Sequence, residues 1–345
     1  MIRVGIVGCN FGCAVHLPAF RADPRCRVVA LAGRDASRTA KLAADVGVPY
    51  SFGNWQELVE HPDVDAISIA ILPELQPAVA IAALSRGKPV FAEKPLASNL
   101  TQAEAMLRQA RSSSKTTMVD FNFTQVLALR KAKEMIDAGT IGTLRHVVVT
   151  WNVENAATRF RADSWKTRGS SGGGALGNFV SHSFHYLEWF CGRIDGLFAR
   201  LSGLRDRPDM ETNVTLALSF VSGASGGLTM SCASFLGSGH RLELYGEEGT
   251  LMLVNETTDY MRGFVLSHAT RATARLERVE LNDLVDQQFA DGRVAPISRL
   301  VSHFLDAIEG KVAATPDFAE GYRVQSLLDT ARRSHDAQRW LKCED

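Results

Sequence analysis

The composition offers no basis for a charged partner or a membrane. The 345 residues include 38 basic and 38 acidic side chains, so the formal net charge is zero. A chain without excess positive charge lacks the electrostatic footprint of nucleic-acid or anionic-membrane binding. Its apolar runs are only as long as a strand, too short to span a bilayer. We therefore expect no nucleic-acid partner and no membrane association.

Cysteine is scarce and scattered along the chain. No C-x-x-C pair occurs, so the sequence predicts neither a zinc site nor a disulfide framework, and no metal is expected. The chain begins at once with a strand rather than a signal peptide, and we expect the reducing cytoplasm as its location. The six cysteines are Cys9, Cys13, Cys26, Cys191, Cys232 and Cys343.

What the sequence does contain is a regular alternation of short apolar strands and helices in its first third. This pattern is typical of a doubly wound parallel sheet with right-handed crossovers. The later chain predicts a long helix at 175–191, a run of strands between 196 and 281, and two final helices. A length of 345 residues suggests two domains, which we place at 1–120 and 121–345.

An imperfect dinucleotide fingerprint follows the first strand. Against G-x-G-x-x-G, Gly8 fits, Asn10 replaces the second glycine, Cys13 replaces the third, and Gly12 stands one place early. Asn tolerates a positive φ better than other non-glycine residues, so the turn can survive. We expect a phosphate to bind the amides of Asn10, Phe11 and Gly12 at the helix N-terminus.

The end of the second strand concerns the choice of cofactor. In folds of this kind the residue there contacts the adenosine ribose, and an acidic side chain repels a 2′-phosphate. Here Gly33 is followed by Arg34, which favours NADP(H) over NAD(H). The alternative is that Arg34 is a solvated residue at a helix start and that Asp35 discriminates between the two cofactors.

Two further stretches carry residues suited to chemistry. Lys94 comes directly after a buried strand, at the sheet edge where open α/β sheets bind ligands. On the helix at 175–191, Asn178, His182, His185 and Tyr186 lie opposite an apolar stripe. These side chains can both donate and accept hydrogen bonds at neutral pH, whereas an ordinary solvent-exposed face carries mainly charged residues. We therefore interpret them as facing a cleft, although His185 is also compatible with a core histidine.

Four segments resemble one known family in order and spacing. The sequence is similar to the glucose–fructose oxidoreductase / inositol dehydrogenase family (Gfo/Idh/MocA) over nearly its whole length. This resemblance implies an N-terminal Rossmann domain and a C-terminal α/β domain with a large, mostly antiparallel open sheet. It also implies a nicotinamide cofactor, a polyol or ketose-type substrate, and a homodimer or homotetramer formed through that sheet. The segments are Gly5–Gly8, His16–Ala19, Val64–Ala70 and Gly87–Ala97.

The resemblance also assigns individual residues. It implies a cis Lys94–Pro95 bond that aims Lys94 at the substrate, and His182 as the acid/base. Asn178 stands where the family has an Asp, so the usual Asp–His pair is absent; Tyr186 is a reserve proton donor. Gln76 stands where a histidine is common. Glu93, Leu72 in the loop after the fourth strand, and the Trp165–Lys166 pair are expected beside the cofactor.

These observations predict an NAD(P)-dependent oxidoreductase. It would move a hydride between nicotinamide and a secondary alcohol or ketone of a sugar, sugar derivative or cyclitol. Lys94 and His182 would handle the substrate oxygen and proton. Two alternatives stay open: an NAD-dependent glycosidase-type hydrolase of the same fold, and a non-catalytic NADP(H)-responsive binding protein.

Overall fold

The computed structural model describes residues 1–344, with Ser170 described by its backbone alone. The chain divides into two compact units, the first formed by 1–122 with 289–325 and the second by 123–288 with 326–345. The first boundary lies two residues from the one expected at 120. The expected second domain is interrupted, because residues 289–325 return to the N-terminal unit.

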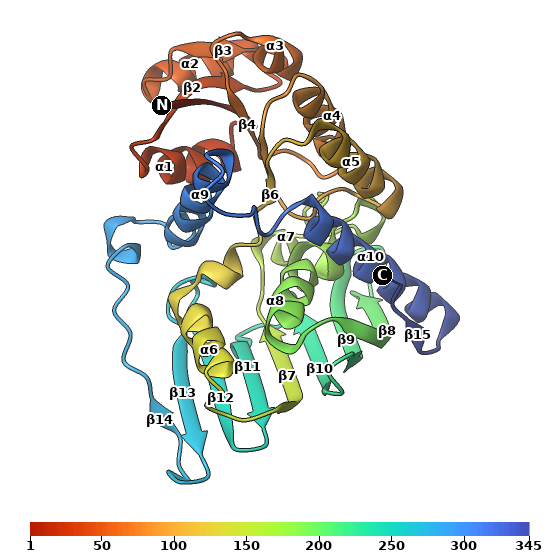
Figure 1. The fold of residues 1–345 in the computed structure, drawn as a ribbon. Helices are drawn as coiled ribbons and strands as arrows, with labels where there is room; N and C mark the ends of the chain where they lie inside the picture. Colours follow the sequence, from red (N-terminus) through yellow and green to blue (C-terminus); the bar gives the residue numbers. More distant parts are fainter. Residues whose placement is uncertain (345) are drawn as a thin grey trace. The chain divides into compact units, whose positions relative to one another are not determined.

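The first unit contains a six-stranded parallel sheet in the order β3-β2-β1-β4-β5-β6. Figure 1 shows α4 beside α5 on one face of this sheet and α1 beside α9 on the other. This arrangement confirms the doubly wound prediction. The strands are β1 (Ile2–Val7), β2 (Cys26–Ala32), β3 (Tyr50–Phe52), β4 (Ala66–Ile69), β5 (Val90–Ala92) and β6 (Thr117–Val119). The helices are the π-helix η1 (Gly12–His16), α1 (Leu17–Arg21), α2 (Ala36–Asp45), α3 (Trp55–Glu60), α4 (Gln76–Ser85), α5 (Leu100–Ser113) and α9 (Val294–Ile308).

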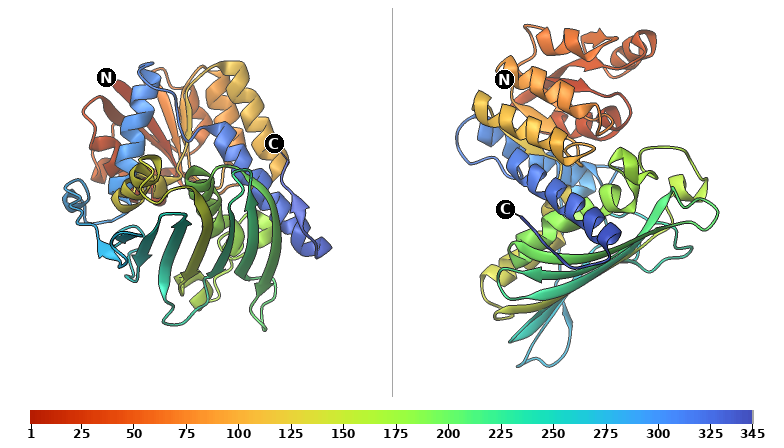
Figure 2. Two further views of the ribbon diagram at one scale, coloured as in Figure 1. Left: turned by 60° about the horizontal axis from the view of Figure 1, so that its bottom comes forward. Right: turned by 90° about the vertical axis from the view of Figure 1, so that its right-hand side faces the viewer.

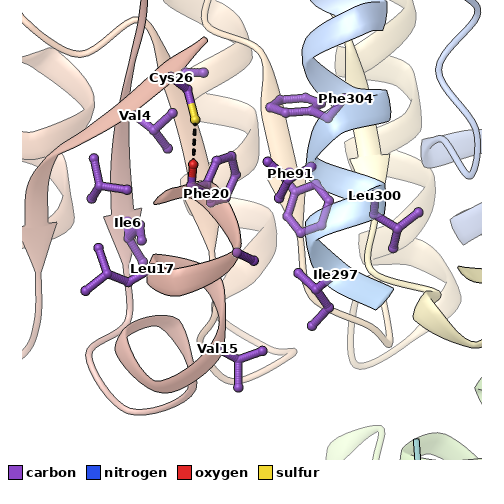
Figure 3. Close-up of a cluster of buried hydrophobic side chains, with 14 of the residues drawn as sticks. Val4, Ile6, Val15, Leu17, Phe20, Cys26, Phe91, Ile297, Leu300 and Phe304 are labelled. Carbon is purple, nitrogen blue, oxygen red and sulfur yellow. Dashed lines mark hydrogen bonds between the residues drawn. The ribbon is translucent and has the colours of Figure 1, made fainter. Parts of the chain in front are cut away.

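Residues 289–325 join the first unit because α9 completes its hydrophobic core. Ile297, Leu300 and Phe304 are fully buried on α9 and belong to one hydrophobic cluster with Phe91 of β5 (Figure 3). The Phe91 and Phe304 rings meet edge to face at 5.7 Å between centroids. Burying this stripe removes apolar surface from water, which is the main force holding α9 against a sheet whose last strand in the sequence ends at Val119.

The second unit contains a nine-stranded sheet in the order β14-β13-β12-β11-β7-β10-β9-β8-β15. Only the β7–β10 pair is parallel, which confirms a mostly antiparallel sheet. The strands are β7 (Leu144–Asn152), β8 (Ile194–Gly203), β9 (Glu211–Phe220), β10 (Ser225–Ser231), β11 (Gly239–Gly246), β12 (Gly249–Asn255), β13 (Val265–Thr270), β14 (Glu277–Arg278) and β15 (Leu341–Lys342).

The helices of the second unit gather on one face of its sheet, and the views in Figure 2 show no helix over the other face. Burial alternates along β9, where Val214, Leu216 and Leu218 are buried while Thr215 and Ala217 are exposed. The helical segments are η2 (Asn122–Gln125), α6 (Leu127–Asp137), α7 (Ala156–Arg159), η3 (Gly169–Ser171), the π-helix η4 (Leu176–Val180), α8 (Ser181–Cys191), η5 (Asp286–Gln288) and α10 (Phe318–Ala337), the last of which begins in the first unit. Within the described residues, none of the helices has the length and apolar character needed to cross a membrane.

Candidate functional site

The loop after β1 keeps the shape of a dinucleotide cradle despite its missing glycines. Gly8 has φ +114°, and a Cβ there would lie 2.2 Å from the Ala70 carbonyl oxygen. Gly12 packs η1 against the first strand, since a Cβ there would lie 2.7 Å from the Ile6 side chain. Gly12 therefore does the helix–strand packing of the third fingerprint glycine, one place early. Binding of a cofactor phosphate at this helix N-terminus stays a prediction.

Asn10 does not act as the substitute glycine that the sequence suggests. It is absent from the described residues with positive φ, so its tolerance of that region is not used. Its side-chain oxygen accepts a hydrogen bond of 3.1 Å from the Arg38 guanidinium of α2. Beside it, the Phe11 ring lies 5.2 Å below the Arg293 guanidinium. The sequence did not indicate that Arg38 lies next to the fingerprint loop.

After β2, the side chain of Arg34 is exposed, whereas that of Asp35 is hydrogen-bonded to the start of α2. Arg34 is exposed. Asp35 caps α2, accepting hydrogen bonds from the Arg38 backbone amide at 3.0 Å and from the Ser37 hydroxyl at 2.8 Å. A capping carboxylate is held toward its own helix, which satisfies one of the free amides there.

The main chain after β5 is held by hydrogen bonds from the side chain of Gln76. The Lys94–Pro95 bond is cis, as the resemblance implies. Gln76, fully buried at the start of α4, donates from Nε2 to the carbonyl oxygens of Glu93 at 3.0 Å and Pro95 at 2.9 Å. The residue that replaces the common histidine thus fixes the main chain on both sides of Lys94. Leu72, in the loop before it, is 40% exposed.

Glu93, the residue before Lys94, belongs to a buried polar cluster that sequence reasoning missed. His16 of η1 is fully buried; its Nδ1 lies 2.7 Å from the Ser68 hydroxyl and its Nε2 lies 2.9 Å from Glu93. An Asp120 oxygen lies 3.7 Å from the same Nε2. The only sequence signal was that His16 and Glu93 both belong to segments shared with the family, which does not reveal that they touch.

The charges in this cluster balance. Burial lowers the pKa of His16, but hydrogen bonds to Asp120 and Glu93 outweigh it and raise the pKa to about 9. Burial raises the pKa of Asp120 to about 8, helped by repulsion from Glu93. Against the opposing effect of burial, the His16 hydrogen bond keeps the pKa of Glu93 below its usual value. At neutral pH the cluster is an imidazolium, a carboxylate and a protonated carboxyl group, which together carry no net charge.

The same three residues are the one group of described side chains whose donor atoms lie close enough to hold a metal ion. We assign no metal there. Both ring nitrogens of His16 are engaged in hydrogen bonds, and the charge of Lys94 also lowers the pKa of Glu93. A metal cation at this place would be repelled by the His16 imidazolium and the Lys94 ammonium group. The three residues are therefore better suited to binding a proton than a metal ion.

The helix predicted at 175–191 is present, but it begins as the π-helix η4 and continues as α8. Asn178 is half-buried, whereas His182 is 5% and His185 8% exposed. The His182 ring contacts Phe123 with centroids 4.8 Å apart. The helix α8 is buried nearly all round, so it has no open polar side, and the role of this stripe in a site stays a prediction.

Tyr186 shows this most clearly. Its side chain is fully buried, its hydroxyl donates to Ser183 at 2.9 Å, and it meets His240 Nε2 at 3.0 Å. His240 in turn stacks flat on Trp151 at 4.2 Å. Burial raises the pKa of Tyr186 and lowers that of His240 to about 3. Tyr186 is thus a buried residue beside a neutral histidine, and its role as a reserve proton donor stays a prediction.

The triple glycine before η4 serves packing within the protein. A Cβ on Gly173 would lie 1.7 Å from the Trp165 carbonyl oxygen, and one on Gly174 would lie 2.5 Å from a Glu211 oxygen. Glu211 accepts from the Leu176 amide at 2.8 Å and from Arg332 at 2.7 Å, which anchors the start of η4. Trp165 is half-buried and Lys166 is exposed; their place beside the cofactor stays a prediction.

Comparison with known proteins agrees with this geometry. Residues 2–121 match the oxidoreductase family with an NAD-binding Rossmann fold, and residues 129–252 match the GFO/IDH/MocA C-terminal domain. An uncharacterized oxidoreductase of Synechocystis sp. is 31% identical over all of this chain and 96% of its own. The chain belongs to the GFO/IDH/MocA oxidoreductase family. It is therefore an NAD(P)-dependent enzyme, as the resemblance implied.

Two further comparisons concern one relative of this oxidoreductase. Levoglucosan dehydrogenase of Pseudarthrobacter phenanthrenivorans is 24% identical over 99% of the chain and 97% of its own length. A solved structure of levoglucosan dehydrogenase with NADH and levoglucosan has a TM-score of 0.89 at 23% identity and covers both chains completely. This likeness shows that the fold is shared.

The buried cluster of this oxidoreductase makes its stability depend on pH. The pKa of Asp120 is raised from 3.8 to about 8. The stabilising contribution of its protonated form to the free energy of unfolding is therefore full below pH 3.8 and is lost as the pH rises through 8. Asp120→Asn, which mimics the protonated carboxyl group and cannot ionise, should give a thermal unfolding midpoint that falls less between pH 5 and 8 than that of the wild type. The control is Asp45→Asn at the exposed end of α2. Equal slopes for wild type and Asp120→Asn would contradict the assignment.

Proposed function

We propose that this oxidoreductase transfers a hydride between a nicotinamide cofactor and a secondary alcohol or ketone of a sugar, sugar derivative or cyclitol. The observation that carries the proposal is the end of β5, where Gln76 fixes the main chain around Lys94 and a neutral buried cluster supports Glu93. A cation held in this way at the carboxyl end of a parallel strand suits the stabilisation of negative charge on a substrate oxygen. The family membership and the sugar named for levoglucosan dehydrogenase support the substrate class.

In this proposal the protein positions the substrate and exchanges the proton, while a bound nicotinamide would supply the hydride chemistry. Gly8, Asn10, Phe11 and Gly12 would hold the cofactor phosphates by their backbone. Lys94 would donate a hydrogen bond to the reacting substrate oxygen, and His182 would exchange its proton. Asn178 can orient an imidazole but cannot accept a proton from it, so the pH profile should lack the contribution of a carboxylate at this position.

The role of Lys94 can be measured directly. Lys94→Ala should lower turnover by about 100-fold or more, because one preorganised donor to a developing oxyanion is lost. Cofactor affinity should stay at the wild-type value, as measured by nicotinamide fluorescence. Lys115→Ala, which removes an exposed lysine from the same unit, is the matched control. Near-normal turnover of Lys94→Ala would contradict the proposal.

The same assay separates the two alternatives. A panel of polyols and ketoses is followed by the change in nicotinamide absorbance. A hydrolase would cleave glycosides with no net change in the redox state of a tightly held cofactor. A non-catalytic protein would bind cofactor and turn over no substrate.

We further propose that NADP(H) is preferred over NAD(H). Arg34 is exposed just after β2, and Asp35 is engaged in capping α2, so a cation rather than an acid is available to a 2′-phosphate. Arg38, which contacts Asn10 of the fingerprint loop, adds a second positive charge nearby.

Arg34→Ala should weaken NADPH binding by about tenfold or more while changing NADH binding little, since only NADPH carries the phosphate that loses its partner. Titration of each cofactor against nicotinamide fluorescence measures both constants. Arg27→Ala, at an exposed position near the other end of β2, is the control. Tighter binding of NADH than NADPH by the wild type would show instead that Asp35 discriminates.

We also propose a homodimer or homotetramer formed through the nine-stranded sheet. The views in Figure 2 show no helix over its outer face, and the exposed residues there on β9 and β10 are small and uncharged: Thr215, Ala217 and Thr229. Such a face can pack closely against a second copy. The reducing cytoplasm remains the location that we propose, and cell fractionation tests it.

Ala217→Arg should convert the oligomer to a smaller species, because a long charged side chain would be buried between the two sheets. Light scattering coupled to size-exclusion chromatography gives the mass of each variant. Ala40→Arg on the exposed side of α2 is the control for adding an arginine. A wild-type protein that is monomeric at every concentration would disprove this mode of assembly.

A further inference from the structure

Gln76 is the first residue of α4, yet its side chain serves another part of the chain. Polar side chains at a helix start commonly bond the free amides of their own first turn. The Gln76 side chain instead donates to the main chain after β5, to the carbonyl oxygens of Glu93 at 3.0 Å and Pro95 at 2.9 Å. The residue between these two acceptors is Lys94, which is half-buried.

A primary amide suits two carbonyl acceptors particularly well. Its nitrogen carries two hydrogens in one plane, so one hydrogen is available for each carbonyl oxygen. A hydroxyl group, or one ring nitrogen of the histidine that is common in the family at this position, offers a single hydrogen. An ammonium group offers three hydrogens, but burying its charge costs more than burying a neutral amide. The side chain present at position 76 therefore matches the pair of carbonyls that it contacts.

The orientation of the Gln76 amide follows from its surroundings. Gln76 is fully buried, and within the part of the chain that the structure describes its Oε1 atom has no hydrogen-bond partner. The reversed amide would place Oε1 against two carbonyl oxygens, which offer it no hydrogen, so the nitrogen must face them. A buried acceptor without a partner costs free energy. The side chain is thus arranged for its two donated bonds, at the expense of its own oxygen.

The peptide groups on both sides of Lys94 are held as a result. Before it, the Glu93 backbone amide donates to the Ile69 carbonyl oxygen at 2.9 Å, and the Glu93 carbonyl accepts from Gln76. After it, Pro95 is buried and its carbonyl accepts from the same nitrogen. Because peptide groups are planar, the groups on either side of a residue set the direction of its Cα–Cβ bond. The hold on the main chain therefore sets the direction in which the Lys94 side chain leaves it.

We propose that Gln76 is a positioning residue for Lys94, which directs the lysine at the substrate oxygen by holding the carbonyls of Glu93 and Pro95. The effect on the reaction rests on the proposed function, because it requires Lys94 to contact the reacting oxygen, whereas the hold on the main chain does not. In this role Gln76 need not touch substrate or cofactor. A donor that is displaced from a developing charge stabilises it less, so a side chain that acts through the main chain can still change the rate.

The first experiment measures the hold on the main chain and requires no substrate. Hydrogen exchange followed by mass spectrometry compares the wild type with Gln76→Met, which keeps the length of the side chain and removes both donated bonds. Exchange in peptides that cover 92–98 should become faster by about tenfold or more, because local opening is easier without these bonds. Gln76→His keeps one donor, disturbs the core less and should give an intermediate rate.

Ser298→Ala is the matched control for this measurement. It also removes a bond from a buried side chain to a main-chain carbonyl, the one from Ser298 to Ala295 at 2.8 Å on α9. Exchange over 92–98 should stay at the wild-type rate in this variant. Wild-type exchange over 92–98 in both Gln76 variants would overturn the proposal.

The second experiment distinguishes positioning from a general structural role by a double-mutant cycle. The substrate is the compound of the polyol and ketose panel that the wild type turns over fastest. Gln76→Met should lower kcat by about tenfold or more while cofactor affinity stays at the wild-type value. In a Lys94→Ala background the same change should lower kcat no further, since the side chain that Gln76 directs is gone. An equal loss with and without Lys94 would show a structural role only and would refute positioning.

The results also separate this proposal from the proposed function. Near-normal turnover of Lys94→Ala would remove the role of Lys94 and, with it, any positioning of that role by Gln76. If Lys94→Ala loses turnover while Gln76→Met keeps it, even though exchange over 92–98 is faster, Lys94 retains its role and positioning by Gln76 alone is wrong. Ser298→Ala should keep the wild-type kcat throughout.

Discussion

The hydrogen bond between His16 and Glu93 is the interaction on which the rest of the site depends. It joins the first turn after β1 to the end of β5 within the Rossmann unit, across 77 positions of sequence. Glu93 and Asp120 could not both be buried as carboxylates, because the cost of desolvating two like charges is high. A charged His16 and a protonated Asp120 remove that conflict, and the main chain that carries Lys94 can then be held in place.

Gln76 completes this support from the other side. Its two hydrogen bonds to the carbonyl oxygens of Glu93 and Pro95 fix the backbone before and after Lys94. The side chain of Lys94 thus extends from a segment whose main chain is held by an amide and whose acidic neighbour is held by an imidazolium. In the proposed mechanism, this rigid support would let Lys94 stabilise charge on the substrate oxygen with little reorganisation.

The fold could be predicted from the sequence because its signals are local or belong to shared segments. Strand and helix periodicity predicted the parallel sheet, and the Glu93-Lys94-Pro95 segment predicted the cis bond. The return of α9 to the first unit could not be predicted, because the sequence of an amphipathic helix does not say which apolar surface the helix will cover. The structure identifies that surface by the contact between Phe304 and Phe91.

The interior of the site was harder to predict for a related reason. A helical stripe of polar residues was interpreted as a cleft face, but Tyr186 is enclosed because His240, from a distant strand, supplies its hydrogen bond. The cluster of His16, Ser68, Glu93 and Asp120 likewise draws on three strand ends and a helix, and no spacing in the sequence links them. Polar residues that satisfy each other in the core look, in sequence, like polar residues that face water.

The central claim is that His16 is an imidazolium at neutral pH although it is fully buried. Nitrogen-15 NMR of histidine-labelled protein measures this directly, with His16→Gln used to assign the signal. The account predicts that the His16 nitrogens keep the shifts of the charged ring through neutral pH and titrate near pH 9. A neutral His16 ring at pH 7, or a titration near the ordinary value of 6.5, would contradict it.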